Sequence, residues 1–207
     1  SPRKPYDAPN WLSTSRAVKF GELEDAEKLR VSGYYPDLIR VNFQVPPDLF
    51  GWRKQGIPVH MKYRYTARPE TDKSTLNVNV NEQFLRSLPL RAMDHSPPTR
   101  LEGMLNKVTP ASDLLPAEEL FHIPLFKLPS RSQLQLHYHY EIKKEGACKD
   151  VLLDNVRGTV EPDSTIDITG FSHFLAMPDL AAFGNSGFPF SRLADLSETA
   201  VVLPAQP

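Results

Sequence analysis

The chain has 207 residues, enough for one packed domain with an appended segment. Its 24 basic and 25 acidic residues leave a net charge of -1, which gives no electrostatic basis for binding nucleic acid or an anionic membrane surface, so we expect no nucleic-acid partner. Proline is disfavoured in helix interiors and central strands, so the 20 prolines predict many short strands joined by turns.

The clearest strands alternate apolar with polar residues, a pattern typical of a strand with one buried and one solvated face. These strands are 39–45, 59–65, 76–80 and 134–142. Weaker patterns predict further strands at 17–22, 28–32, 84–91, 120–126 and 164–169. Eight or nine short antiparallel strands predict an all-β fold, a jelly-roll β-sandwich that we assign to residues 1–169.

Other segments depart from this alternation. Leu101, Met104, Leu105 and Val108 have helical spacing within 97–119 and predict a short surface helix, whereas 143–156 is polar and predicts a loop.

The character of the chain changes after Thr169. Pro178 followed by 179–183 predicts a short helix that starts at a proline. The continuous apolar run 199–203 (TAVVL) predicts a strand buried on both faces, as in a parallel α/β sheet. We therefore expect 170–207 to be a linker, a short helix and the first strand of a following α/β domain that is truncated here.

Several long stretches resemble one family, the periplasmic regulatory subunit of bacterial cellulose synthase. The longest is 163–204, DSTIDITGFSHFLAMPDLAAFGNSGFPFSRLADLSETAVVLP. The others are 36–66, 74–81 and 120–138, with IPL at 123–125 and SQLQLHY at 132–138. Together these stretches cover well over half of the chain.

The resemblance implies a subunit in which two jelly-roll, carbohydrate-binding-like domains alternate with two flavodoxin-like domains. This chain is similar to the second jelly roll and the lead-in to the second flavodoxin-like domain. The implied partners are the membrane-embedded catalytic subunit, which makes cellulose under cyclic di-GMP control, the nascent cellulose and the other domains of the same subunit. The implied location is the periplasm, with a membrane anchor outside this fragment. No catalytic residue and no cofactor carries over.

Aromatic side chains in predicted loops are the candidate carbohydrate-binding residues, because flat rings stack on the apolar faces of glucose units. They are Trp11, Tyr34, Tyr35, Phe50 and Trp52, with Trp52 as the favoured ring. Any such contact should be weak, since a tightly held polymer could not keep moving outward. The alternative is that these rings close the ends of the sandwich over its core.

Metal binding and glycoside hydrolysis find less support. His137 and His139 share one predicted strand face, but a metal site needs a further ligand, for which only His60 is an obvious candidate. A glycosidase needs two convergent carboxylates, and only Glu141 and Asp167 lie in predicted strands. We therefore predict no metal site and no enzyme activity.

A spacing that could clamp the phosphates of cyclic di-GMP occurs at Arg64 and Arg68, as R-x-x-x-R. The companion D/N-x-S-x-x-G element is incomplete, because Asn77 stands where glycine is needed after Asp72 and Ser74. The resemblance therefore implies a non-catalytic module that supports the synthase and guides the exported glucan. The alternative is a purely structural protein–protein interaction domain.

Overall fold

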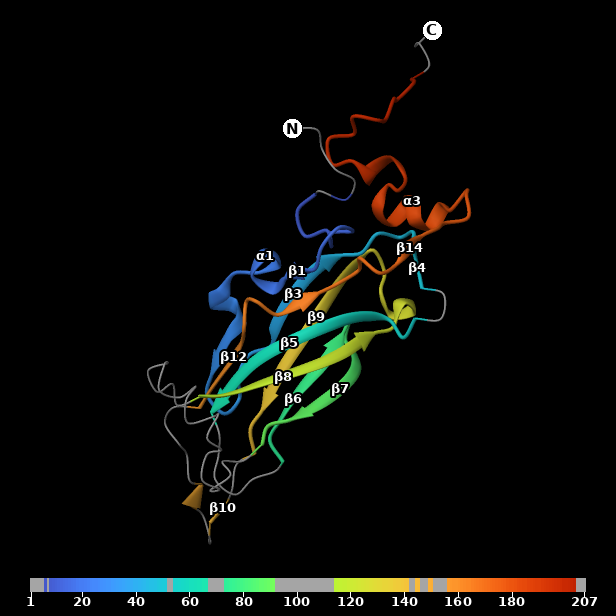
Figure 1. Cartoon of the computed structure of the whole chain (residues 1–207). Coiled ribbons are helices and arrows are strands. Elements are labelled where there is room, and N and C mark those ends of the chain that lie inside the picture. The colour runs from blue at the N-terminus through green and yellow to red at the C-terminus, as the bar shows by residue number, and fades with distance from the viewer. Residues whose placement is uncertain are drawn as a thin grey trace.

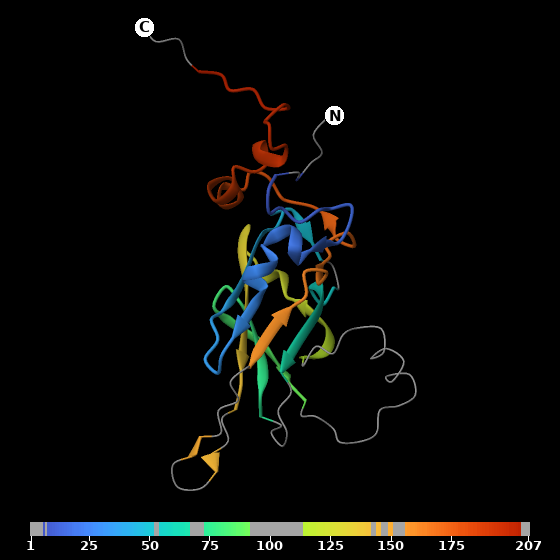
Figure 2. The same ribbon diagram turned by 90° about the vertical axis from the view of Figure 1, so that its left-hand side faces the viewer.

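The computed structural model describes residues 6, 8–51, 54–66, 73–91, 114–141, 144–145, 149–150 and 156–203. Two antiparallel sheets lie face to face as the layers of a sandwich (Figures 1 and 2). The four-stranded sheet has the order β3 (Ile39–Gln44), β9 (Arg131–His139), β6 (Thr75–Val80) and β7 (Gln83–Pro89). The prediction of an all-β antiparallel sandwich is confirmed.

The second sheet is built around β5 (Ile57–Thr66), which pairs along its whole length with β8 (Leu114–Ile123). On its other side β5 pairs with two strands, β13 (Thr165–Ile166) and β12 (Arg157–Val160), which in turn pair with β1 (Val18–Lys19) and β2 (Arg30–Ser32). Small two-stranded ladders lie outside the sandwich: β4 (Leu49–Phe50) with β14 (Ser172–His173), and β10 (Lys144–Glu145) with β11 (Lys149–Asp150).

The core fills the space between the two inner faces, with alternate residues of each long strand pointing into it. Four tyrosines belong to this core, and they stack in two pairs: Tyr63 with Tyr65 at 6.1 Å and Tyr138 with Tyr140 at 6.0 Å between ring centroids. Burial raises the pKa of Tyr63 to about 12 and raises the pKa of each of the other three above its ordinary value. All four therefore remain neutral near pH 7.

Tyr138 links the two sheets. Its ring lies against Gly158 so closely that a Cβ atom at position 158 would come within 2.7 Å of the ring. Its hydroxyl lies 3.0 Å from the carbonyl oxygen of Arg64 and 2.9 Å from that of Thr159, which belong to β5 and β12. One hydroxyl proton is shared between these two acceptors, so the β9 side chain connects to two strands of the opposite sheet.

Some element boundaries differ from the sequence prediction. The strand expected at 17–22 is only β1, and the chain then turns into the helix α1 (Phe20–Leu23), because the Glu22 carboxylate accepts the Lys19 N–H at 3.0 Å. Residues 26–29 form a 3-10 turn, η1 (Ala26–Leu29), ahead of β2.

The residues that carry the helical spacing at 97–119 lie outside the described part of the chain. The last of that segment, 114–119, is strand and belongs to β8, which continues to Ile123 before the 3-10 turn η2 (Leu125–Lys127). The predicted loop at 143–156 contains the short β10–β11 ladder.

The C-terminal segment lies beyond one end of the sandwich (Figure 1). The predicted short helix is present as α3 (Leu180–Ser186), but it starts at Leu180 rather than at Pro178. Asp179 is its N-cap, and the Asp179 carboxylate accepts the Ala182 N–H at 2.8 Å. The helix ends at Gly187, whose φ of 71° suits glycine. A 3-10 turn, η3 (Phe190–Arg192), follows.

The expected strand at 199–203 is not formed within the described residues, and Val202 is 90% exposed. A strand buried on both faces needs sheet partners on either side, and no described segment supplies them. Among the helices that the structure describes, none has the length and apolar character needed to cross a membrane.

Candidate functional site

The outer faces of the two sheets differ in their chemistry. On the six-stranded sheet, the polar side chains of β5 pair with carboxylates across the face. The pairs are Lys62–Asp163 at 2.6 Å, Arg64–Glu161 at 2.5 Å and His60–Glu118 at 3.2 Å. This surface is zwitterionic, and each of these basic groups already has a partner.

The outer face of the four-stranded sheet carries a row of neutral amides, with the exposed Arg40 opposite Gln135 and Arg131 opposite Gln44 beside them, and we call it the amide face. It is formed by Asn42 on β3, Gln133 and Gln135 on β9, and Asn77 and Asn79 on β6. The strand register brings them together, because Asn42 lies opposite Gln133 and Asn79 lies opposite Gln135. Partners directly opposite one another point to the same side of a sheet.

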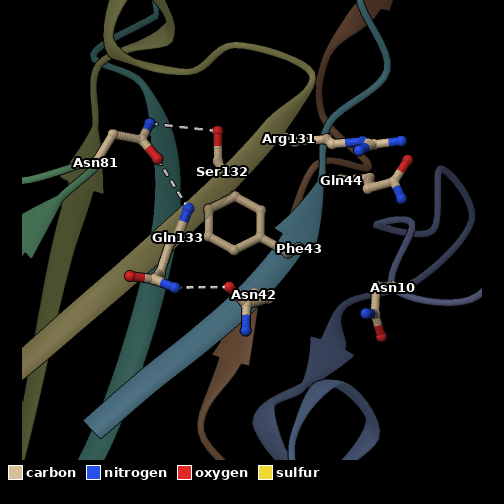
Figure 3. A pocket seen from close by; sticks show the side chains of 8 residues that line it. All are labelled: Asn10, Asn42, Phe43, Gln44, Asn81, Arg131, Ser132 and Gln133. Carbon is tan, nitrogen blue, oxygen red and sulfur yellow. Dashed lines mark hydrogen bonds between the residues drawn. The ribbon is translucent and has the colours of Figure 1, made fainter. Parts of the chain in front are cut away.

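Hydrogen bonds connect three of these amides, Asn42, Gln133 and Gln135, into a ladder. The Gln133 Nε2 donates to the Asn42 Oδ1 at 2.8 Å, as Figure 3 shows. The Gln135 Nε2 donates to the Gln133 Oε1 at 2.8 Å. The Gln135 Oε1 accepts the backbone N–H of Glu82 at 3.1 Å. An amide offers two protons and two lone pairs, so the ladder fixes its orientation and leaves capacity for a ligand.

A hollow of about 370 Å³ lies at one end of the amide face. Its lining, drawn in Figure 3, is Asn10, Asn42, Phe43, Gln44, Asn81, Arg131, Ser132 and Gln133. Asn81 supports this end structurally, since its Oδ1 accepts the Gln133 N–H at 2.9 Å and its Nδ2 donates to the Lys127 carbonyl at 2.9 Å. Asn81 and Glu82 form the β6–β7 turn, where both have positive φ, as a tight hairpin requires.

An exposed aromatic ring lies at the opposite edge of the amide face. Leu88 is buried, so strict alternation along β7 would point Phe84 into the core as well. A β-bulge after Val78 shifts the register and sets Phe84 opposite Asn79, which is on the outer face. Phe84 is consequently 60% exposed and shares the outer side with the amides. An apolar ring beside a row of amides can stack on a sugar ring while the amides bond its hydroxyls.

The candidate aromatic residues named from the sequence do not form one cluster. Tyr35, 87% exposed, and Tyr34, which packs on the core, precede the Ile39 end of β3, whereas Trp11 pairs with Gln44 at its other end. The length of β3 separates them by about 17 Å.

Phe50 lies on β4, beyond the Gln44 end of β3, and its ring contacts Phe174 edge-on at 5.8 Å. Trp52 lies outside the described residues. Of the four candidates that the structure describes, only Trp11 borders the amide face.

The other candidate groups named from the sequence are far apart. His137 and His139 lie on the outer side of β9, whereas His60 lies on the outer face of the other sheet, so the three do not meet. Asp167 lies beside Pro58 at the start of β5, and Glu141 lies beside Ser74, at the end where β5 finishes. The ten residues of β5 separate these two carboxylates by about 30 Å.

Comparison with known proteins gives this geometry a context. A family model described as "Cellulose synthase BcsB, second CBM domain" matches residues 17–165. The chain belongs to the BcsB family. A second model, "Cellulose synthase BcsB, second FD domain", matches residues 173–207. The sandwich that carries the amide face thus corresponds to the first match, and the segment with α3 to the second.

Curated relatives match the whole chain. "Cyclic di-GMP-binding protein" of Pseudomonas fluorescens (strain SBW25) is 46% identical over 99% of this chain and 27% of its own length. The protein of the same name from Escherichia coli (strain K12) is 40% identical over 100% and 26%. "Cellulose synthase 1" of Komagataeibacter xylinus is 35% identical over 100% and 13%. The chain thus spans about a quarter or less of these relatives.

Proposed function

We propose that this chain is a non-catalytic module of the regulatory subunit of a bacterial cellulose synthase, and that its amide face contacts the exported glucan. In this proposal the subunit is periplasmic, is tethered to the inner membrane by an anchor outside these residues, and supports the membrane-embedded catalytic subunit. Membership of the BcsB family and the names of the relatives support the assignment to a cellulose synthase.

The hydrogen-bonded amide ladder is the observation that carries the glucan contact. A β-1,4-glucan is uncharged and rich in hydroxyls, so it needs oriented donors and acceptors rather than ion pairs. The amide face supplies these through Asn42 and Gln133, the latter oriented by the buried Gln135, with the Phe84 ring available for stacking. The zwitterionic outer face of the other sheet lacks this combination in its described residues.

The contact should be weak, because the glucan has to keep moving. A stacked ring at single-stranded nucleic acid sites is worth about 1–3 kcal/mol. By analogy, one ring with a few amide hydrogen bonds gives a binding free energy of about -4 kcal/mol, a Kd of about 1 mM.

Titration of the 207-residue chain with cellotetraose, followed by backbone amide NMR shifts, tests the proposal. We expect saturable shifts confined to β3, β6, β7 and β9, and Gln133→Leu should weaken binding about fivefold through the loss of roughly 1 kcal/mol of hydrogen bonding. The matched control is Lys62→Met on the other outer face, which should leave the Kd unchanged. A parent chain whose shifts do not respond to cellotetraose would overturn the glucan contact.

A purely structural role is the second candidate, and the C-terminal segment favours it. Apolar side chains are exposed there, namely Phe174, Met177, Leu180, Phe183, Phe190, Val201, Val202 and Leu203. Many exposed apolar side chains within one segment are typical of surfaces that pack on another domain. In our proposal residues 1–169 form the jelly-roll unit, and residues 170–207 lead into a flavodoxin-like domain that this apolar segment joins.

The name of the relatives raises the question of cyclic di-GMP, and we expect no binding by this chain. Arg64, the described half of the R-x-x-x-R spacing, has its Nε 2.5 Å from the Glu161 carboxylate in the middle of a paired strand. Calorimetry with cyclic di-GMP at high micromolar concentration should therefore give no binding heat. A saturable signal that disappears in the Arg64→Ala, Arg68→Ala double variant would contradict this.

A further inference from the structure

A second hollow, of about 410 Å³, adjoins the amide face at the N-terminal segment. Trp11, Ser13, Thr14 and Ser15 line it, and Asn10 lines both this hollow and the one on the amide face. The Asn10 carbonyl accepts the Gln44 N–H at 2.6 Å, and the Gln44 carbonyl accepts the Leu12 N–H at 2.9 Å. The segment 10–12 therefore runs alongside β3 and extends the four-stranded sheet at its edge.

The register places Trp11 on the same side as the amides. Trp11 pairs in parallel with Gln44, whereas its neighbour Leu12 is fully buried in the core. Because successive residues of an extended chain point to opposite faces, the Trp11 side chain points away from the core of the sandwich. It is partly buried there, packed against the small cluster of Tyr6, Ala182 and Phe188, and it also lines the second hollow. About four strand spacings of roughly 4.8 Å separate segment 10–12 from β7, and Trp11 lies about 13 Å further along the strands than Phe84. The two rings are therefore about 23 Å apart across the face.

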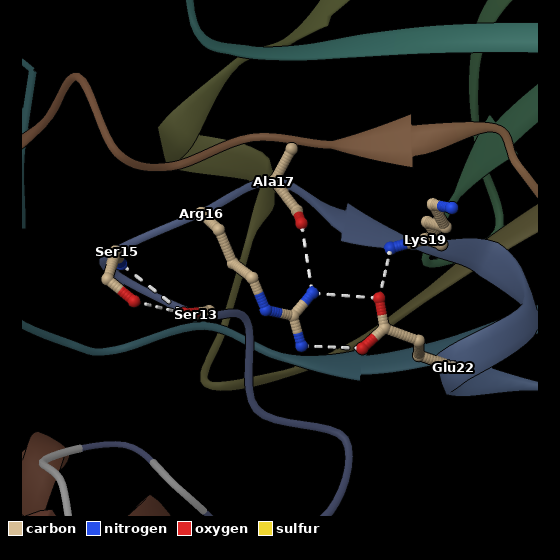
Figure 4. A network of polar contacts seen from close by, with 6 residues as sticks. All are labelled: Ser13, Ser15, Arg16, Ala17, Lys19 and Glu22. Carbon is tan, nitrogen blue, oxygen red and sulfur yellow. Dashed lines mark hydrogen bonds and ion pairs between the residues drawn. The ribbon is translucent and has the colours of Figure 1, made fainter.

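The hollow at Trp11 is polar and uncharged overall, and a network of polar contacts orders its Arg16 and Glu22 side chains (Figure 4). The Arg16 guanidinium binds both Glu22 carboxylate oxygens, at 2.8 and 2.6 Å, and also donates to the Ala17 carbonyl at 3.1 Å. This pairing, together with the Lys19 N–H, lowers the pKa of Glu22 to about 2, so the pair stays ionised and mutually neutralised. The Ser13 and Ser15 hydroxyls lie 3.1 Å apart beside it.

We propose that the Trp11 hollow is a second glucan subsite, continuous with the amide face through Asn10, so that the sheet binds one extended β-1,4-glucan chain along a track from Phe84 to Trp11. This inference rests on the proposed glucan contact. It adds the path of the bound glucan chain across the sheet, the length of chain that is bound, and a second aromatic ring on which a glucose unit stacks. A disaccharide fills only the amide hollow, whereas a longer chain also reaches Trp11 and the serine hydroxyls.

The test compares cellobiose with cellohexaose on the 207-residue chain. We expect cellohexaose to bind about tenfold more tightly, and Trp11→Ala to abolish that advantage while leaving the cellobiose Kd unchanged. Trp11 also contacts Tyr6, at 5.7 Å between ring centroids, so a variant that keeps this contact is needed. Ser15→Leu, at an exposed position that lines the hollow, should remove the cellohexaose advantage in the same way.

Fluorescence gives a direct readout, because the chain has only two tryptophans. In a Trp52→Phe background, cellohexaose should change the emission of Trp11 and cellobiose should not. Cellohexaose and cellobiose binding equally well, or Trp11→Ala weakening both alike, would overturn the second subsite while leaving the glucan contact standing. Absence of binding by either sugar would instead overturn the proposed function, and this inference with it.

Discussion

Replacing Tyr138 by alanine is expected to lower the free energy of unfolding by about 3–5 kcal/mol, the range found when a large buried aromatic residue is removed. The side chain is fully buried, stacks on Tyr140 and touches Gly158 of the opposite sheet. The resulting cavity would lie between the two layers, where neither sheet can collapse without disturbing the other.

A second variant separates the ring from its hydroxyl. Tyr138→Phe keeps the packing but deprives the carbonyls of Arg64 and Thr159 of their shared donor, so we expect a smaller loss of about 1–3 kcal/mol. Tyr35→Ala is the matched control at a tyrosine that is almost fully exposed, and it should change stability by less than about 0.5 kcal/mol. Urea unfolding measures all three, and a loss below about 1 kcal/mol for Tyr138→Ala would contradict this account of the core.

Tyr138 also illustrates how much of the fold the sequence could predict. The alternation of apolar and polar residues identified β3, β5, β6 and β9 and placed their apolar residues in the core, because each of these strands has one solvent-exposed face. The first half of β8 was missed, since it falls in the 97–119 segment for which a short surface helix was predicted, and Pro116, Glu118 and Glu119 give this edge strand no clear alternation. The four-residue β12 has too little pattern to recognise, and its Gly158 is required by the Tyr138 ring rather than by any local turn.

The candidate site was less accessible from sequence than the fold. The amide residues were visible as the polar positions of separate strands, but the ladder depends on pairing Asn42 with Gln133, 91 positions apart. The exposure of Phe84 depends on a bulge, which alternation cannot predict. The preference for loop aromatics selected Trp11, which borders the amide face, together with rings at other places on the sandwich. A search for strands whose solvent-exposed positions are rich in Asn and Gln would have found this face.

Replacing Asp48 by alanine should be the second most damaging change, with an expected loss of about 1–3 kcal/mol. The Asp48 side chain is nearly buried and binds two partners from distant parts of the chain. Its Oδ2 accepts the Tyr6 hydroxyl proton at 2.6 Å, and its Oδ1 lies 3.0 Å from the Nδ1 of His173, whose ring stacks on Tyr6. Burial, followed by the hydrogen bond to Asp48, raises the pKa of Tyr6 well above its ordinary value.

These contacts tie the N-terminal segment and the C-terminal segment to the end of the sandwich. Tyr6 also packs with Ala182 and Phe188 around α3, and its N–H donates to the Arg192 carbonyl at 2.8 Å. Without the carboxylate, the Tyr6 hydroxyl would be buried with no acceptor. Local opening of this junction costs less free energy than unfolding the sandwich, so we expect the junction to open first. Asp48→Ala should therefore increase proteolytic cleavage near residues 6 and 173 before the sandwich itself unfolds.

A double-mutant cycle isolates the contact between Asp48 and Tyr6. Tyr6→Phe removes the buried hydroxyl, so Asp48→Ala should cost less in that background, with a coupling energy of about 1 kcal/mol or more. The matched control is Asp163→Ala, which removes a half-exposed carboxylate paired with Lys62 at 2.6 Å and should cost less than about 1 kcal/mol. Two results would contradict this account of the junction. One is an equal loss of stability in Asp48→Ala and Asp163→Ala, and the other is a double-mutant cycle with no coupling energy between Asp48 and Tyr6.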